Sequence, residues 1–254
     1  MNRIYWDEDK IGMLTDQINA EPHKHWMMQI FLSLEDELYM RIEKEEVVGK
    51  CIVVNQNIIH VFNCEQKVHF SILIFPTSRL SIGLKDKIQN AAYYKVESSM
   101  LDKIQILARE MIQNKRISYY MKVMDKLYEC LDVHIQCMPY DERIKEILKH
   151  VSECDCMDHS VDELSKKINL SSSRLAHLFR EQIGMPLKSY ILLHQVTKVF
   201  ELLLNGTSIT DAALMAGFDT PSHFAATTKK MMGMPARLSS KNSEFLKVSY
   251  NPLD

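Results

Sequence analysis

The first 90 residues contain short apolar stretches separated by polar ones, which is the pattern of β-strands. β-Branched and aromatic residues fill these stretches, and polar or charged turns separate them. The expected strands are residues 28–34, 38–42, 51–54, 58–62 and 68–75. Several short strands at close spacing predict a sandwich or barrel. The acidic runs at 35–37 and 43–46 are expected at hairpin tips, with a further turn at 55–57.

From Ser98 onward the apolar positions follow the period of a helix. Met100, Ile104 and Met111 recur at helical spacing, and the same pattern returns over residues 117–131. The sequence therefore predicts two amphipathic helices. Such helices can pack on the barrel, on each other or on a second copy of the chain, and we expect the last arrangement, a homodimer.

Pro139 interrupts this pattern, because proline cannot continue a helix and disfavours helical backbone at the preceding residue. We therefore expect one domain over residues 1–138 and a second over residues 139–254.

The second domain contains a small helical unit that occurs twice. Ser160 and Glu163 have the spacing of a capping box and start a short helix, which a polar turn joins to a helix capped by Ser171. Ser208 starts the second copy. The apolar segment 189–204 connects the copies and spans on the order of 24 Å as a helix. Two such units can enter successive major grooves, about 34 Å apart along one face of B-DNA.

The second helix of the first unit is apolar on one face and polar on the other. Leu175, Leu178 and Phe179 form the apolar face. The opposite face carries Ser173, Arg174, His177 and Arg180. Reading a major groove needs donors and acceptors for base edges and cations for phosphates. For this helix alone a solvated surface is the simpler interpretation, and the second copy of the unit favours DNA reading.

The stretch from Ser160 to Ser239 resembles the DNA-binding domain of the AraC/XylS family of transcriptional regulators, which has two helix-turn-helix units. The matching positions are Ser171 to Leu175, Phe179, Gly184, Pro186, Tyr190, Ile191, Ile209, Ala212, Ala213, Ala216, Gly217, Phe218, Ser222, His223, Phe224, Lys229, Gly233 and Pro235. The resemblance implies double-stranded DNA as a partner, RNA polymerase as a second one, and activation rather than repression.

The sequence departs from the family pattern at several positions. Gln195 replaces the usual arginine of the linker helix, Val199 replaces a small residue, and Thr228 replaces an aromatic one. Ala225 and Ala226 stand where family members often have long polar or basic residues. We therefore expect the first unit to carry most of the sequence specificity and the second mainly to position the protein.

Two sets of residues follow as candidate DNA contacts. The expected base-reading residues are Ser173, Arg174, His177, Ser222 and His223. The expected phosphate contacts are Ser171, Arg180, Lys188, Thr227, Lys229 and Lys230.

The histidines of the strand-rich half resemble the layout of a small cupin barrel, which sometimes holds a metal on an H-x-H pair and a third histidine. His23 and His25 form the pair, and His60 lies on a later strand. The acidic ligand usually expected after the pair is missing, and Gln29 stands near its place. The favoured interpretation is a ligand pocket formed by these four residues without a metal or another cofactor. His69 is expected on the polar face of its strand.

Composition and charge narrow the class of protein. A chain of 254 residues with 46% hydrophobic residues favours two domains. Residues 160–254 contain 11 basic and 8 acidic residues, a formal balance of +3, whereas the preceding part has a balance of −5. This is a weak charge pattern for a C-terminal DNA binder.

The cellular setting is expected to be the cytoplasm. The N-terminus lacks a signal-peptide pattern, and no apolar run approaches the roughly 20 residues of a membrane span, so we expect no membrane contact. The six cysteines are then expected as thiols, because Cys154 and Cys156 are spaced too closely for the usual zinc motif.

The sequence thus predicts an α+β fold: an N-terminal cupin-like β-barrel with flanking dimerisation helices, and a C-terminal all-α domain with two helix-turn-helix units joined by a linker helix. The expected function is sequence-specific transcriptional regulation, not catalysis, controlled by a small-molecule effector or a regulatory protein at the N-terminal domain. The alternative is a metal-dependent cupin enzyme with an attached helical domain, which rests on His23, His25 and His60.

Overall fold

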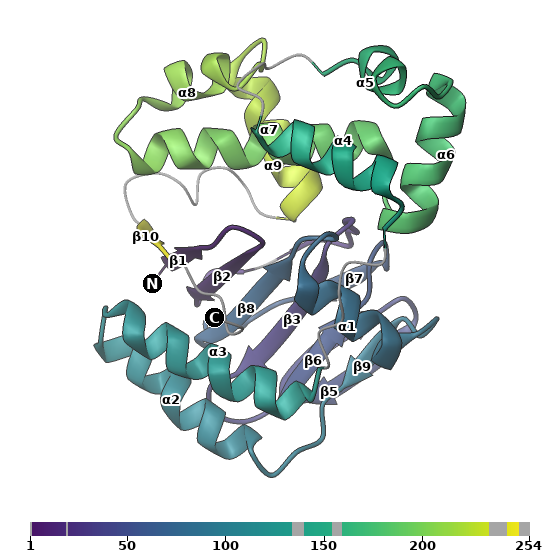
Figure 1. Cartoon of the computed structure of the whole chain (residues 1–254). Coiled ribbons are helices and arrows are strands. Elements are labelled where there is room, and N and C mark those ends of the chain that lie inside the picture. The colour runs from purple at the N-terminus through teal and green to yellow at the C-terminus, as the bar shows by residue number, and fades with distance from the viewer. Residues whose placement is uncertain (1, 19, 134–139, 154–158, 234–242, 249–254) are drawn as a thin grey trace. The chain divides into compact units, whose positions relative to one another are not determined.

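The computed structural model describes residues 2–18, 20–133, 140–153, 159–233 and 243–248. The chain divides into two compact units (Figure 1). Unit 1 comprises residues 1–136 and 232–254, and unit 2 comprises residues 137–231. The expected boundary between residues 138 and 139 lies outside the described residues, as do Cys154 and Cys156.

Unit 1 contains two β-sheets. Its strands are β1 (Asn2–Trp6), β2 (Lys10–Thr15), β3 (Met28–Ser33), β4 (Leu38–Ile42), β5 (Glu45–Gly49), β6 (Cys51–Val54), β7 (His60–Phe62), β8 (His69–Ile74), β9 (Tyr93–Lys95) and β10 (Ser243–Lys247). Seven strands form one sheet in the order β10-β1-β2-β8-β3-β6-β9, and the second sheet has the order β5-β4-β7. Since β10 and β9 end the first sheet without pairing with each other, the described strands form two sheets and not the closed barrel that we expected.

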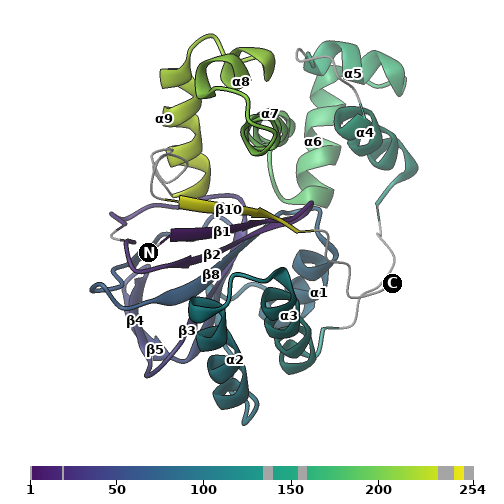
Figure 2. The ribbon, with the colours of Figure 1, turned by 90° about the vertical axis from the view of Figure 1, so that its left-hand side faces the viewer.

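Three helices cover one face of the seven-stranded sheet: α1 (Arg79–Ile88), α2 (Leu101–Gln113) and α3 (Ile117–Leu131) (Figures 1 and 2). Successive side chains of a strand point to opposite faces of its sheet. In β3, Ile30 and Leu32 therefore join the core with the helices, whereas Phe31 joins a second core with residues of β4, β5 and β7. Burial on both faces explains why β3 is apolar along almost its whole length.

Several elements of unit 1 differ from the sequence-based expectation. The strands β1, β2 and β9 and the helix α1 were not predicted. The acidic run 43–46 is a hairpin tip only at its start, where Glu43 has a φ of 54°. Glu45 and Glu46 already belong to β5, where both are exposed while Val47 is buried. Charge at these two exposed positions concealed the strand pattern.

The last described strand, β10, lies at the edge of the seven-stranded sheet. It pairs in parallel with β1, with Ser243 opposite Asn2 and Lys247 opposite Trp6. The guanidinium of Arg3, which is buried, donates to the carboxylate of Glu244 at 3.2 Å. The chain therefore returns to unit 1 after the last helix of unit 2, so the expected second domain, 139–254, includes a strand that belongs to the first.

Unit 2 is helical in its described part. Its helices are α4 (Glu142–Glu153), α5 (Val161–Lys167), α6 (Ser172–Ile183), α7 (Leu187–Leu204), α8 (Ile209–Met215) and α9 (Pro221–Met232). The helix α7 has 18 residues, which gives a length of about 27 Å. Figure 2 looks along α7 and shows α6 and α9 on opposite sides of it. In the part of the chain that the structure describes, no helix combines the length and apolar character needed to cross a membrane.

Candidate functional site

The two helix-turn-helix units begin in the same way. The hydroxyl of Ser160 accepts a hydrogen bond from the backbone N–H of Glu163 at 3.1 Å, and the hydroxyl of Ser208 accepts one from Asp211 at 3.2 Å. Each bond satisfies an N–H group that the helix itself leaves free and stabilises the helix by about 1 kcal/mol. The same local chemistry therefore sets the first residue of α5 and of α8.

The turns of the two units are also alike. Asn169 and Gly217 occupy them with φ values of 53° and 82°, a left-handed conformation that Asn and Gly tolerate best. The next residues, Leu170 and Phe218, each donate their N–H to the carbonyl five positions earlier, at 3.0 Å in both cases. The direction in which the chain enters α6 and α9 is set by these bonds.

The helices after the turns share their caps and their ends. The hydroxyls of Ser171 and Thr220 each accept the N–H of the residue three positions later, at 3.3 and 3.1 Å. Gly184 and Gly233 follow the two helices with φ values of 87° and 68°. Thr220 was not predicted as a cap, although a threonine directly before a proline is a recognisable start of a helix.

These matching ends align α6 with α9 residue by residue. In this alignment Ser173 corresponds to Ser222, Arg174 to His223, His177 to Ala226, and Arg180 to Lys229. The two helices thus have similar side chains at the first and last of these positions. They differ most at the third position, where α6 has the imidazole of His177 and α9 has the methyl group of Ala226.

The predicted contacts of the first unit share one exposed helix face. Leu175 and Phe179 are fully buried. Among the predicted contacts of this segment, the exposed residues are Ser171, Ser173, Arg174, His177 and Arg180. Ser173 and His177 are one turn apart opposite the buried face, so both can reach a groove at the same time. Glu181 is exposed as well and adds one negative charge to this helix.

A polar contact fixes α6 on α5. The hydroxyl of Ser172 donates to the carboxylate of Asp162 and lies 3.2 Å from the hydroxyl of Ser165. The second unit has Ala213 and Pro221 at the positions of Ser165 and Ser172. Its two helices therefore pack without this polar contact.

The predicted contacts of the second unit lie mostly on the surface, with one exception. The exposed ones are Ser222, His223, Lys229 and Lys230, and Lys188 is exposed near the start of α7. Thr227 is only 7% exposed, because it follows the buried Phe224 by three residues and precedes the buried Met231 by four. This spacing places Thr227 on the inner face of α9. The expected phosphate contact of Thr227 is therefore wrong for this conformation.

His223 is held by neighbours of its own unit. Its Nδ1 lies 3.6 Å from the carboxylate of Asp219, which is 92% exposed. Its ring packs edge-on against Phe218, with 5.4 Å between the ring centroids. The exposed carboxylate beside the imidazole adds negative charge at this end of α9.

The histidines predicted to line a pocket come together in unit 1. His23 and His60 form an antiparallel bridge, in which each N–H donates to the carbonyl of the other at 3.2 and 3.0 Å. The ring centroids are 4.4 Å apart for His23 and His60, 5.1 Å for His25 and His60, and 5.6 Å for His23 and His25. Gln29 adds its side-chain oxygen at 3.0 Å from Nε2 of His25. All four predicted residues thus lie in one cluster, which we call the histidine cluster.

Burial controls the protonation of this cluster. It lowers the pKa of His25 to about 4, with a smaller opposing effect from the hydrogen bond to Gln29. Burial also lowers the pKa of His60 to about 3, with a smaller contribution in the same direction from the neighbouring His25. Both imidazoles are therefore neutral at pH 7.

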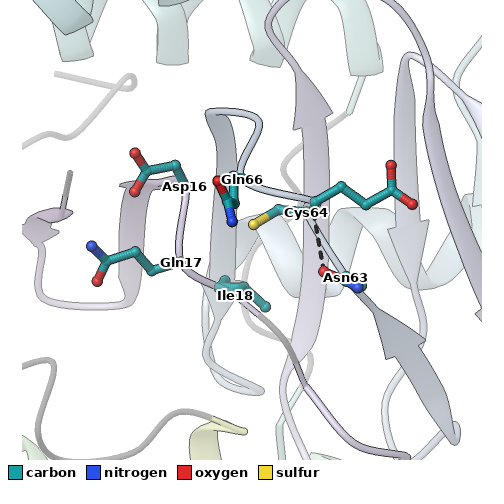
Figure 3. Close-up of a pocket in the computed structure, with 7 residues that line it drawn as sticks. Asp16, Gln17, Ile18, Asn63, Cys64 and Gln66 are labelled. Carbon is teal, nitrogen blue, oxygen red and sulfur yellow. Dashed lines mark hydrogen bonds between the residues drawn. The ribbon is translucent and has the colours of Figure 1, made fainter.

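A surface pocket lies elsewhere in unit 1. It has a volume of about 600 Å³ and is lined by Asp16, Gln17, Ile18, Asn63, Cys64, Glu65 and Gln66. Figure 3 shows that these residues come from the segments that follow β2 and β7. The N–H of Cys64 donates to the carbonyl of Ile18 at 3.0 Å and joins the two segments. This pocket was not predicted from the sequence, because no motif marks the two segments as neighbours.

Comparison with known proteins identifies the helical part. Residues 164–238 match a family described as a helix-turn-helix domain. The arabinose operon regulatory protein of Escherichia coli is 31% identical over 103 residues, which are 37% of this chain and 33% of that protein. The probable transcriptional regulator LumQ of Photobacterium leiognathi is 24% identical over 223 residues, which are 84% of this chain and 88% of that protein.

Solved structures extend the likeness to the whole fold. A structure of ToxT from Vibrio cholerae with a bound unsaturated fatty acid has a TM-score of 0.54. The match covers 90% of this chain and 93% of that one at 12% sequence identity. At this identity the likeness concerns the fold alone.

The fold and the site define a DNA-binding transcriptional regulator: an N-terminal sheet domain precedes a helical domain with two helix-turn-helix units. The comparisons support an AraC/XylS-type transcriptional regulator. They point to transcriptional regulation as the function.

Proposed function

We propose that this regulator recognises specific DNA sequences chiefly through α6. The observation that carries the proposal is the difference between two helices with the same local structure: the exposed His177 of α6 corresponds to Ala226 of α9. A methyl group cannot donate or accept a hydrogen bond at a base edge, whereas an imidazole can do both. Ser173 and Arg174 complete the reading set of α6.

In this proposal α9 mainly contacts phosphates. Lys229 and Lys230 are exposed in its last turns, and cations there neutralise DNA phosphates without reading sequence. Arg180, Lys188 and the cap Ser171 have the same role around α6. Ser222 and His223 contribute less to base reading, since Asp219 lies beside the imidazole of His223.

Unit 1 is proposed as the sensing and dimerising part of a cytoplasmic homodimer, with its two sheets as an open form of the cupin-like arrangement. Ile106 on α2 and Met121 on α3 are apolar and exposed, which supports a dimer contact through these helices. A small-molecule effector or a regulatory protein bound at this unit shifts the dimer between states that differ in DNA affinity. We propose activation, with RNA polymerase as a partner, on the resemblance to the family.

The ToxT structure with a bound fatty acid supports the idea that this fold can accommodate an effector. The surface pocket of unit 1 is a poor match to a fatty acid, since Asp16 and Glu65 contribute carboxylates to its lining. Effectors with a polar or cationic group suit this pocket better.

Selection of duplexes from a random pool, followed by methylation interference and footprinting, tests the proposal on DNA. We expect protection of two major-groove segments about one helical turn apart. Base methylation should interfere strongly in one segment and weakly in the other. Failure to enrich any sequence, or equal interference in both segments, would contradict it.

A further inference from the structure

In the histidine cluster, Nδ1 of each imidazole lies beside a backbone carbonyl oxygen. Nδ1 of His23 lies 2.9 Å from the carbonyl oxygen of Glu21, and Nδ1 of His25 lies 2.9 Å from that of Met27. Nδ1 of His60 lies 3.0 Å from the carbonyl oxygen of Ile58. A carbonyl oxygen only accepts hydrogen bonds, so each of these contacts needs a proton on Nδ1. Nε2 of His60 therefore presents a lone pair in the neutral ring, whereas Nε2 of His25 lies 3.0 Å from the side-chain oxygen of Gln29.

Nε2 of His60 is buried and has no hydrogen-bond partner among the described residues. One nitrogen from each of the three rings lies within 4.8 Å of those of the other two. Three imidazoles with ring nitrogens this close together form a donor set that suits a metal ion.

The three Nδ1 contacts also match what metal-binding histidines need around them. A backbone carbonyl that accepts the second ring proton fixes the tautomer and the orientation of the ring. The backbone reinforces this order, since the bridge between His23 and His60 and the bond from the N–H of Asn57 to the carbonyl of His25, at 2.7 Å, join the two segments. The ligand positions are therefore held before any ion binds.

We propose that His23, His25 and His60 bind one divalent transition-metal ion of the zinc type, with a fourth position open beside Gln29. Imidazole nitrogens favour Zn²⁺ and its neighbours in the first transition row, whereas Mg²⁺ and Ca²⁺ favour oxygen. This differs from the interpretation that the sequence favoured, in which the missing acidic ligand argued against a metal.

Binding of one metal ion by all three histidines requires a small movement of the imidazole rings. Zn–N bonds of about 2.1 Å in a tetrahedral site place the nitrogens about 3.4 Å apart. The buried His25 and His60 are held in place by their surroundings, while His23 is half-buried and precedes β3. His23 is therefore the ligand that moves, and its exposed side gives an ion access to the site. A bound ion then links the segment before β3 to β7.

Metal titration of the full-length protein, first freed of metal by chelation and dialysis, tests this inference without DNA. We expect saturable binding of one Zn²⁺ per chain by calorimetry. Co²⁺ should give visible absorption bands of a nitrogen-coordinated ion, and Zn²⁺ should raise the midpoint of thermal unfolding.

His23→Ala is the main variant, because its half-buried position lets the chain fold, as circular dichroism will verify. We expect its zinc affinity to fall at least about 100-fold, and His60→Ala should do the same if it folds. His150→Ala is the matched control, since His150 is half-buried on α4 in unit 2 and should leave binding unchanged. Absence of saturable zinc binding in the wild type would overturn the inference, as would unchanged binding by folded His23→Ala.

Discussion

The imidazole of His69 packs edge-on against Phe62, with 4.7 Å between the ring centroids, beside the core that joins the two sheets. It is 1% exposed. Burial lowers its pKa from 6.5 to about 4, while the nearby backbone of Lys67 and the carboxylate of Asp16 oppose the shift. The folded protein therefore binds fewer protons than the unfolded chain between about pH 4 and 6.5. Its stability falls as the pH drops through this window.

Replacing His69 with glutamine should weaken this acid sensitivity. Glutamine does not titrate, so the variant should lose less free energy of unfolding between pH 7 and pH 4.5 than the wild type does. A shift of this size corresponds to on the order of 3 kcal/mol over the whole window. Urea denaturation at several pH values measures the difference, and parallel curves for the two proteins would refute this account of His69.

The same residue shows a limit of sequence reasoning. The alternation along β8 correctly separates His69 from Phe70 and Ile72, but it does not reveal that a second sheet covers the other face. The polar face that we expected is buried.

Thr227 was misplaced for a different reason. Its spacing from Phe224 already indicates the inner face of α9, and its polar chemistry was given too much weight.

At the scale of elements, β10 joins the end of the chain to its beginning. Its pairing with β1 covers the edge of the seven-stranded sheet, and Glu244 contacts both Arg3 and Lys115, at 3.2 and 3.1 Å. An uncovered edge strand exposes free backbone groups that can pair with other chains. The strand therefore stabilises unit 1 and satisfies the backbone groups of β1 that would otherwise be exposed.

Removing residues 243–254 should destabilise unit 1 and promote aggregation. The buried guanidinium of Arg3 would lose its carboxylate partner, with a cost on the order of 3 kcal/mol. Removing only residues 249–254 is the control, since it keeps β10. Denaturant unfolding and light scattering compare the two shortened chains, and equal behaviour would show that β10 contributes little.

Elements fixed by local rules were predictable, and those fixed by distant contacts were not. The caps Ser160, Ser171 and Ser208 start their helices as the sequence indicates, because capping involves residues only three positions apart. The pairing of β10 with β1 joins residues at opposite ends of the chain, and no motif records it. The grouping of the strands into two sheets depends on such long-range contacts too, which explains why the expected barrel was wrong.

At the scale of the whole molecule, unit 2 is inserted between two parts of unit 1. Both of its ends therefore continue into unit 1. A change at unit 1 can affect the DNA-binding unit through two connections. This topology suits a regulator in which effector binding and DNA binding are coupled.

DNA affinity should depend on salt through the cations of both helix-turn-helix units. Lys229→Ala removes one exposed charge from α9, so the slope of log affinity against log salt should decrease by about 1 for every duplex tested. Lys247→Ala is the control, because Lys247 is exposed on β10 in unit 1. Fluorescence anisotropy measures both slopes. A loss of DNA affinity confined to one duplex sequence would instead assign Lys229 to base reading.

The most direct test of unequal reading compares His177→Ala with His223→Ala on a selected duplex and its scrambled counterpart. We predict that His177→Ala loses about 1–3 kcal/mol of discrimination between the two duplexes. His223→Ala should weaken binding to both by a similar factor and keep the discrimination. Equal loss of discrimination in the two variants, or a larger loss in His223→Ala, would contradict the assignment of α6 as the main reading helix.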